Sequence, residues 1–230
     1  MDNIARVTDH ILKKLGTKSN RMVLKFLKSN DGKPCFFDEN GGCWRAYEFI
    51  DNSVTYDTCD DLFILEQAGE AFGRFQLWLE DFDADSLYET IPDFHNTEKR
   101  MDKLFEDVRA NPLGRNADAK NEIEFFIKNY DRAVKLSRLV KDGKLPVRVT
   151  HNDTKCNNVL FDTETKRALA VIDLDTVMPG LSLYDYGDAV RFSASTAAED
   201  EADTSKIALD TEKFKAFTKG YLSMTANALS

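Results

Sequence analysis

The stretch from His151 to Asp173 (HNDTKCNNVLFDTETKRALAVID) constrains the fold more than any other part of the chain. Two short β-rich runs, 158–161 and 168–173, lie on either side of the polar segment 162–165, whose composition is typical of a tight turn. The pattern predicts a compact β-hairpin, preceded by a further short strand at 146–150. Its loops carry four polar residues: His151, Asp153, Asn158 and Asp173.

Outside this hairpin, strand and helix patterns are segregated along the chain. Apolar residues at helical spacing predict a helix that Gly16 ends, followed by a strand at 21–27 and a hairpin from 34–37 and 43–50. Few strands and many helices indicate an α+β fold in two unequal lobes, with the boundary near residues 51–60 and the lobes at 1–55 and 56–230. Further helices are expected at 62–80, 97–109, 118–141, 181–193 and 211–224, with a mobile loop or short helix at 194–210.

Charge and hydrophobicity exclude several classes of function. The net charge of −9 makes nucleic acid and anionic membranes poor partners, because both need a basic face. No apolar run approaches the roughly 18 residues of a membrane span, and the residues after Met1 do not form a signal peptide. We therefore expect a cytoplasmic protein. The cysteines form no C-x-x-C pair and have no histidine at metal-ligand spacing, so free thiols are expected at Cys35, Cys43, Cys59 and Cys156.

The spacing of the four polar residues on the predicted hairpin suits phosphoryl transfer. His151, Asp153 and Asn158 form the pattern H-x-D-x-x-x-x-N, and Asp173 follows the apolar run ALAVI about 20 residues after Asp153. Transfer from ATP needs a carboxylate to orient and deprotonate the acceptor hydroxyl, and oxygen ligands for Mg²⁺. The pattern supplies both, and it matches the template known from protein kinases.

On these residues the chain resembles the aminoglycoside phosphotransferase and choline kinase family of protein-kinase-like enzymes. Within that family, the run VTHNDTKCNNVLFD…VIDLDTVMPGLSLYDYGDAVRFSAST is most similar to N-acetylhexosamine 1-kinases, and the similarity extends to residues 1–50 and 69–97. The resemblance implies a protein-kinase-like fold in two lobes. A partial N-lobe would hold a few antiparallel strands and one helix, and a mostly helical C-lobe would hold the catalytic β-hairpin.

The resemblance also implies roles for individual residues. Asp153 becomes the catalytic base, Asn158 and Asp173 become Mg²⁺ ligands, and ATP and Mg²⁺ are the implied cofactors. The implied partner is a small-molecule sugar, an N-acetylhexosamine whose anomeric hydroxyl is converted to the sugar 1-phosphate. The hinge whose backbone meets the adenine would be Tyr47, Glu48, Phe49 and Ile50.

Other polar residues near the motif have more than one interpretation. His151 is expected to support the loop through hydrogen bonds, and Asp185 to cap or anchor a helix beginning near Leu183. Asp175 would touch metal or sugar, or support residues that do. Lys155 would balance phosphate charge or remain solvated.

Two parts of the family pattern are missing from the sequence. The 11 glycines include no G-x-G-x-x-G, and Lys25 follows a helix where the phosphate-gripping lysine of kinases precedes one, so Lys25 is expected at the surface. We therefore expect a chain truncated at both ends, within the N-lobe and after Ser230. The alternatives are a kinase for another hydroxyl, on an aminoglycoside, choline or homoserine, and a non-catalytic nucleotide-binding remnant.

Overall fold

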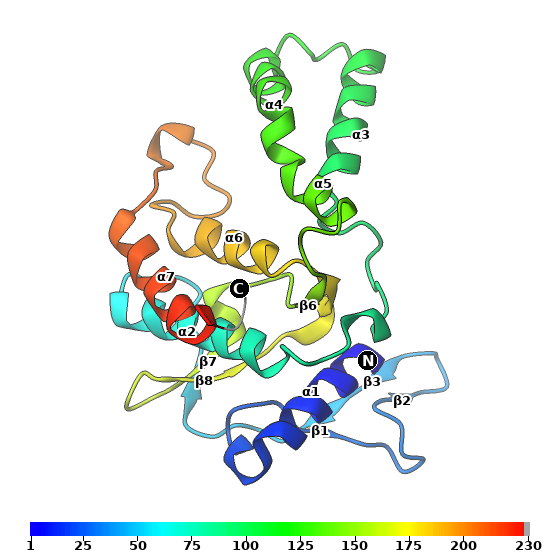
Figure 1. Ribbon diagram of the computed structural model, residues 1–230, viewed down its shortest axis with the longest axis vertical. Helices are drawn as coiled ribbons and strands as arrows, with labels where there is room; N and C mark the ends of the chain where they lie inside the picture. Colours follow the sequence, from blue (N-terminus) through cyan, green and yellow to red (C-terminus); the bar gives the residue numbers. More distant parts are fainter. Residues whose placement is uncertain (228–230) are drawn as a thin grey trace. The chain divides into compact units, whose positions relative to one another are not determined.

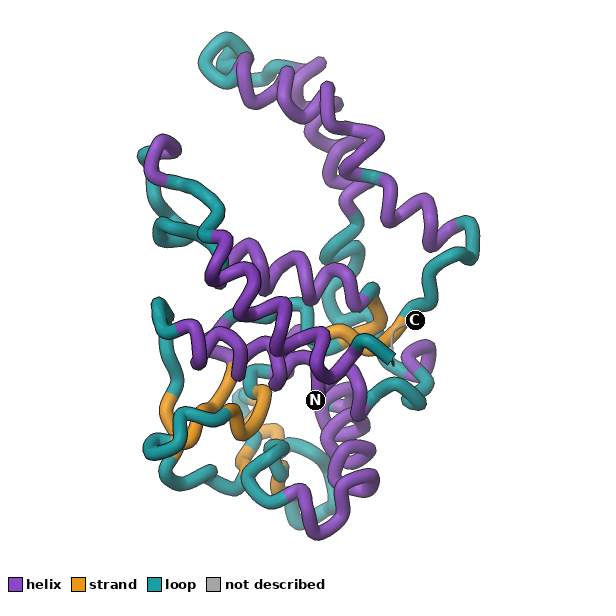
Figure 2. The backbone as a smooth tube through the Cα atoms, turned by 60° about the vertical axis from the view of Figure 1, so that its left-hand side comes forward, coloured by secondary structure: helices purple, strands orange, loops and turns teal. Residues whose placement is uncertain are grey.

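The computed structural model describes residues 1–227, which form two compact units (Figure 1). The first unit combines residues 1–90 with the chain from Arg148 onward, and the second comprises Ile91–Val147. Most of the chain is helix or loop, and the strands are short and antiparallel (Figure 2). The predicted α+β fold class is confirmed.

The first unit begins with the predicted helix, α1 (Asp2–Leu15), which buries one apolar face through Ile4, Val7 and Ile11. It ends at Gly16, whose φ of 54° is a conformation that glycine adopts without strain. The strands that follow are shorter than predicted. They are β1 (Phe26–Leu27), β2 (Phe36–Phe37), β3 (Cys43–Trp44) and β4 (Ala46–Tyr47).

The predicted hairpin of residues 34–50 divides between two partners. Strand β3 pairs with β2, whereas β4 pairs with β1, so the chain changes partner at Arg45. The strand predicted at 21–27 is confined to its last two residues. Its beginning is lost because Arg21 adopts a left-handed conformation with φ of 60° inside the turn at residues 20–22.

Two helices that are distant in the sequence cross in the core of the first unit. Helix α2 (Leu62–Trp78) begins where the Asp61 carboxylate accepts a hydrogen bond from the Phe63 N–H, and α7 (Thr211–Thr225) is capped in the same way by Asp210. The two helix backbones can approach this closely because glycines, which have no Cβ, face the other helix at the contact. A Cβ on Gly69 would lie 2.1 Å from the Phe217 carbonyl oxygen, and one on Gly220 would lie 1.9 Å from that of Glu66.

The predicted hairpin at 146–173 is present in the first unit. Strands β5 (Ser53–Val54), β7 (Val159–Asp162) and β8 (Ala168–Val171) form one antiparallel sheet, and β6 (Arg148–Thr150) pairs with β9 (Met178–Gly180). The predicted turn closes because Asp162 Oδ1 accepts hydrogen bonds from the backbone N–H groups of Glu164 and Thr165. Helix α6 (Ser182–Ser193) follows β9.

Beyond α6, residues 194–210 fold back on themselves. Thr196 N–H donates to the Ala208 carbonyl, and Asp210 N–H donates to that of Ala194. The segment contains only a single 3₁₀ turn, at Thr204–Lys206, so a loop describes it better than an exposed short helix. Within residues 1–227, no helix combines the length and the apolar character needed to cross a bilayer.

The second unit contains three helices, α3 (Thr97–Ala110), α4 (Lys120–Ala133) and α5 (Lys135–Lys141). Helix α3 starts at Asn96, whose side chain accepts from the Lys99 N–H. It packs against α4, where the rings of Phe105 and Tyr130 lie 5.6 Å apart. The prediction of a single helix at 118–141 is wrong about its continuity, because the buried residue Val134 separates α4 from α5.

Candidate active site

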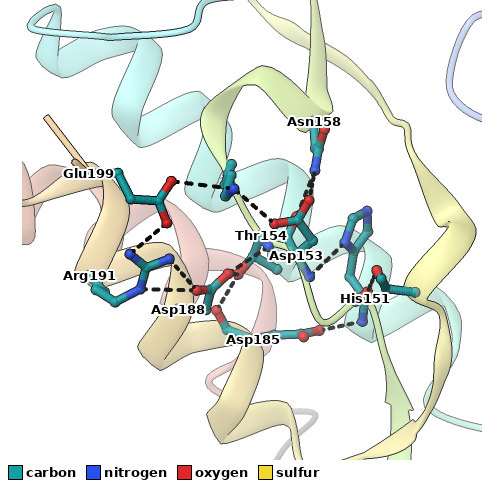
Figure 3. Close-up of polar contacts among 10 residues, drawn as sticks. His151, Asp153, Thr154, Asn158, Asp185, Asp188, Arg191 and Glu199 are labelled. Carbon is teal, nitrogen blue, oxygen red and sulfur yellow. Dashed lines mark hydrogen bonds and ion pairs between the residues drawn. The ribbon is translucent and has the colours of Figure 1, made fainter. Parts of the chain in front are cut away.

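The loop between β6 and β7 is held from below by one buried carboxylate (Figure 3). Asp185, in the first turn of α6, accepts hydrogen bonds from the backbone N–H groups of His151 and Asn152, each at 2.8 Å. It also accepts one from Gln76 Nε2 at 3.0 Å. Of the two roles expected for Asp185, capping is wrong, because the N-cap position is Leu181 and no side chain caps it. Anchoring is correct, because the hydrogen bonds of Asp185 join α6 to the loop.

Burial changes the acid–base behaviour of this anchor. Asp185 is 2% exposed, and loss of hydration raises the pKa of its carboxyl group from 3.8 to about 7. The hydrogen bonds from His151, Asn152 and Gln76 act in the opposite direction, because they stabilise the carboxylate. The anchor is therefore a group whose charge state depends on pH near neutrality.

The imidazole of His151 is completely buried and braces the loop from inside. Its Nε2 donates to the Ile172 carbonyl oxygen at 2.8 Å, and its Nδ1 accepts from the Asp153 N–H at 3.3 Å. The ring also packs edge-on against Phe72 and Phe75. Burial lowers the pKa of His151, so the ring is neutral and supports the loop, the role expected from the sequence.

The structure brings Asp153 and Asn158 into direct contact. Asn158 Nδ2 donates to Asp153 Oδ2 at 2.9 Å and to the Asp153 carbonyl oxygen at 2.8 Å. This orientation commits the amide nitrogen of Asn158 to Asp153 and leaves its oxygen Oδ1 to serve as an acceptor or metal ligand. The Asp153 carboxylate is also 3.5 Å from Lys155 Nζ.

Asp173 lies two residues after the end of β8 and directly follows Ile172, which makes two hydrogen bonds to the loop. The neighbouring residue Ile172 donates its N–H to the Asn158 carbonyl at 2.9 Å, and its own carbonyl accepts from His151. The backbone of Asp173 is left-handed, with φ of 56° and ψ of 59°, and its side chain is exposed. Such a conformation is uncommon for a residue other than glycine and is frequent at functional sites.

These oxygen donors suit Mg²⁺, which binds through one or two protein ligands together with substrate phosphates. Among residues 1–227, no group of three or more His, Cys, Asp or Glu side chains is arranged so that it could hold a metal ion. A cation at this loop would therefore be held by the carboxylate of Asp173 and the amide oxygen of Asn158. The remaining ligands would be phosphate oxygens and water.

Asp175, the alternative ligand, is engaged elsewhere. Both terminal nitrogens of Arg45 bind its two carboxylate oxygens, one of them at 2.8 Å. The ion pair with Arg45 lowers the pKa of the Asp175 carboxyl group. This bidentate contact supports the interpretation of Asp175 as a residue that positions the segment after Asp173.

A chain of charged residues beyond Lys155 was not anticipated from the sequence (Figure 3). Lys155 Nζ lies 3.5 Å from Glu199, whose other oxygen is 3.0 Å from Arg191 Nη1. Arg191 also binds Asp188, and Asp188 accepts from the Thr154 N–H at 3.0 Å. The run YDYGD was a signal for Asp188, since it places two carboxylates three residues apart on one helix. No local pattern identifies Glu199.

The segment expected to meet the adenine begins at Tyr47, the last residue of β4, and continues into the link to β5. The Glu48 N–H donates to the Lys25 carbonyl at 2.9 Å, and the side chains of the two residues form an ion pair at 3.3 Å. Ile50 is buried, and its carbonyl accepts from the Ser53 hydroxyl. In the described part of the chain, no hydrogen bond joins residues 47–50 to Asp153, Asn158 or Asp173.

Comparison with known proteins identifies a phosphotransferase family and solved kinases of similar fold. The model of a family described as "Phosphotransferase enzyme family" matches residues 22–217. Similar folds include a microcompartment-associated aminopropanol kinase, 15% identical with a TM-score of 0.53, where the match covers 97% of this chain and 66% of that one. An amicoumacin kinase in complex with AMP-PNP and Ca²⁺ is 16% identical with a TM-score of 0.55, covering 95% and 60%.

An ethanolamine kinase from Plasmodium vivax is 17% identical with a TM-score of 0.52, and the match covers 98% of this chain and 59% of the kinase. The chain thus spans somewhat less than two thirds of the length of these solved structures. At such low identity the similarity establishes the fold that the chains share.

Proposed function

Because the chain belongs to the phosphotransferase enzyme family, we propose that it transfers the γ-phosphoryl group of ATP to a hydroxyl group of a small molecule. One observation carries this proposal. Asp153 lies on a loop fixed by the buried Asp185, and Asn158 holds its carboxylate by a hydrogen bond of 2.9 Å. A carboxylate in a fixed position beside a potential metal ligand is what phosphoryl transfer requires, since positioning and charge stabilisation supply most of the catalysis.

Each residue of the loop then has a defined task. Asp153 orients the acceptor hydroxyl and takes its proton as the oxygen attacks the γ-phosphorus and the bond to the bridging oxygen of ADP breaks. Asn158 and Asp173 would hold Mg²⁺, which when bound neutralises the charge of the phosphates. Lys155 Nζ lies 3.5 Å from the Asp153 carboxylate, so its positive charge would also help to balance the charge of the phosphates.

The structural neighbours support the class of reaction more than the identity of the substrate. They are an aminopropanol kinase, an ethanolamine kinase and an amicoumacin kinase, and the last was solved with an ATP analogue and a divalent cation. For this chain we propose an N-acetylhexosamine as acceptor, phosphorylated at its anomeric hydroxyl. The support for the sugar is the sequence IDLDTVMPGLSLYDYGD, which is more specific than the shared H-x-D motif.

Further parts of the proposal concern the nucleotide and the setting. Residues 47–50 would contact the adenine through their backbone, and the lobes would divide near residue 55. ATP and Mg²⁺ would be the cofactors. The acidic net charge of −9 argues against nucleic acid as a partner and is compatible with a cytoplasmic enzyme.

An ADP-release assay with a panel of acceptors tests the proposal. The panel comprises N-acetylglucosamine, N-acetylgalactosamine, 1-amino-2-propanol, ethanolamine, choline, homoserine and an aminoglycoside, with Asp153→Asn as the control for background ATP hydrolysis. Turnover restricted to the N-acetylhexosamines is the expected result. Turnover of an amino alcohol alone would leave the reaction class in place and refute the sugar. Calorimetric binding of Mg·ATP without turnover of any acceptor would favour a nucleotide-binding remnant, because the sequence lacks a glycine-rich phosphate loop.

A further inference from the structure

Two thiols lie in the wall of an open pocket beside the catalytic loop. The pocket has a volume of about 550 Å³, and both Cys59 and Cys156 line it. Cys156 is 4% exposed and is the first residue of the 3₁₀ turn that ends at Asn158. Cys59 is partly exposed and lies in the link between β5 and α2. A small solute that enters the pocket can therefore reach the partly exposed Cys59, which lines the same wall as Cys156 of the loop.

The two thiols interact with each other although they are far apart in the sequence. Both thiols line the same pocket, and the nearby Cys156 thiol lowers the pKa of Cys59. Cys59 Sγ also lies 3.5 Å from the Asp61 carbonyl oxygen, which fixes the direction of its side chain. Of the two, Cys59 is both the more accessible and the more acidic thiol, and these properties make a cysteine reactive toward oxidants.

We propose that Cys59 and Cys156 form a redox-sensitive pair, which a small hydroperoxide entering the pocket converts into a disulfide. In the first step, the Cys59 thiolate attacks one peroxide oxygen, the O–O bond breaks, and the second oxygen leaves as water or an alcohol after gaining a proton. In the second step, the sulfur of Cys156 attacks the resulting sulfenic acid, and an S–S bond replaces the S–O bond as water leaves. The two thiols lose two electrons in total and the peroxide gains them.

The disulfide would act on the catalytic loop through geometry. A disulfide brings two Cβ atoms to about 3.5–4.5 Å, so it would fasten Cys156 to the link that precedes α2. Asn158 lies two residues farther on and holds Asp153 through contacts of 2.8 and 2.9 Å. We expect oxidation to displace these contacts and to suppress phosphoryl transfer reversibly. This effect on activity rests on the function proposed above, whereas formation of the bond does not.

The chain supplies its own comparison pair. Cys35 and Cys43 lie on the β2–β3 hairpin, where Phe37 is the partner of Cys43, so the two cysteines are diagonal neighbours across the hairpin. Neither lines the pocket. Four cysteines allow three pairings, and random oxidation would populate all of them. Linkage of Cys59 to Cys156, with any disulfide at Cys35 formed to its hairpin neighbour Cys43, is thus a specific expectation.

Peptide mapping distinguishes the pairings directly. The reduced chain is treated with hydrogen peroxide, free thiols are alkylated, and the protein is digested with trypsin. Cleavage places Cys59 in peptide 46–74 and Cys156 in peptide 156–166, whereas Cys35 and Cys43 share peptide 29–45 because Lys33 precedes a proline. We expect a cross-link between 46–74 and 156–166 that disappears after dithiothreitol. Chain oxidised in urea is the control and should give mixed pairings.

Two variants test the order of the steps. Cys59→Ser should lose the cross-link, and Cys156→Ser should accumulate a sulfenic acid at Cys59 that reacts with dimedone. The double variant Cys35→Ser/Cys43→Ser should retain the wild-type cross-link. The proposal is wrong if peroxide leaves both peptides separately alkylated, links peptide 46–74 to 29–45, or oxidises Cys59 to higher acids with Cys156 still free. These readouts do not require turnover, so a failure of the proposed kinase activity would leave them interpretable.

Discussion

The guanidinium group of Arg45 binds both carboxylate oxygens of Asp175 and thereby joins the point where β3 gives way to β4 to the turn after Asp173. Asp173 itself remains exposed, in a left-handed backbone conformation. The two carboxylates of the sequence DLD therefore differ in their contacts. Arg45 binds the carboxylate of Asp175, whereas that of Asp173 is exposed and is the one that we propose as a Mg²⁺ ligand.

This difference predicts how two alanine variants respond to Mg²⁺. Asp173→Ala should raise the Mg²⁺ concentration needed for ATP binding by about tenfold or more, because the proposed metal ligand is lost. Asp175→Ala should change it by about fivefold at most, since a largely exposed ion pair contributes roughly 0–1 kcal/mol. Calorimetric titration of ATP at several Mg²⁺ concentrations measures both. A larger effect at Asp175 would transfer the ligand role to that residue.

Asp153→Asn should reduce turnover by about 10²–10⁴-fold and leave nucleotide binding almost unchanged. The amide keeps the size of the side chain and can still accept from Asn158, but it cannot take a proton. The substitution Glu164→Gln, in the exposed turn between β7 and β8, is the matched control and should leave turnover as it is. If Asp153→Asn kept more than about a tenth of the wild-type rate, a base would have to be sought elsewhere.

The loop anchor predicts a dependence of stability on pH. The pKa of Asp185 is raised from 3.8 to about 7, so between these values the folded chain binds more protons than the unfolded chain. The contribution of this carboxyl group to stability is therefore fully present below about pH 4 and is lost as the pH rises through about 7. Between about pH 5 and pH 8 the loss should be on the order of 2 kcal/mol.

Urea unfolding of the wild type and of Asp185→Asn over that pH range isolates this effect. The variant cannot titrate at position 185, so the free energy of unfolding of the wild type should fall relative to it as the pH rises. The variant should also be less stable at every pH, by about 1–3 kcal/mol. The reason is that an amide nitrogen would face the donors that the carboxylate now accepts from. A difference that does not change with pH would show that Asp185 is ionised throughout.

The helix crossing in the first unit predicts the effect of single methyl groups. Gly69→Ala and Gly220→Ala should each lower the free energy of unfolding by about 2–3 kcal/mol or more, because the new Cβ would meet a carbonyl oxygen about 2 Å away. Gly187→Ala, on α6, has no atom within 4 Å of its new Cβ. It should be neutral or gain about 0.5–1 kcal/mol from helix propensity. Thermal or urea unfolding compares the three, and equal effects would contradict close packing.

Residues near one another in the sequence account for the features that were predicted correctly. The apolar spacing of α1 and α2, the turn at Asp162 and the sequence of the loop are local properties, and the structure contains each of them. The pairing of Arg45 with Asp175 joins residues 130 positions apart, and no local pattern reports it. The same is true of Glu199, which reaches Lys155 from a loop of small and acidic residues.

Errors in the predicted elements have a similar origin. The helix break at Val134 occurs in a sequence whose helical spacing continues, and the residue is completely buried. Residues 43–50 carry a continuous strand pattern, yet they divide between β2 and β1, because tertiary pairing decides which neighbours each residue meets. Sequence patterns identified the kinds of element in these regions and left their ends undetermined.

The crossing of α2 and α7 also affects how the chain is made. During synthesis, α2 leaves the ribosome long before α7, and at usual elongation rates the interval is on the order of ten seconds. Throughout that time the face of α2 around Gly69 and Gly73 has no partner, since it is α7 that later covers both glycines. The nascent chain should therefore depend on chaperones in this interval. A ribosome-bound chain halted before residue 211 should be digested by protease far more readily than one halted after α7 has emerged.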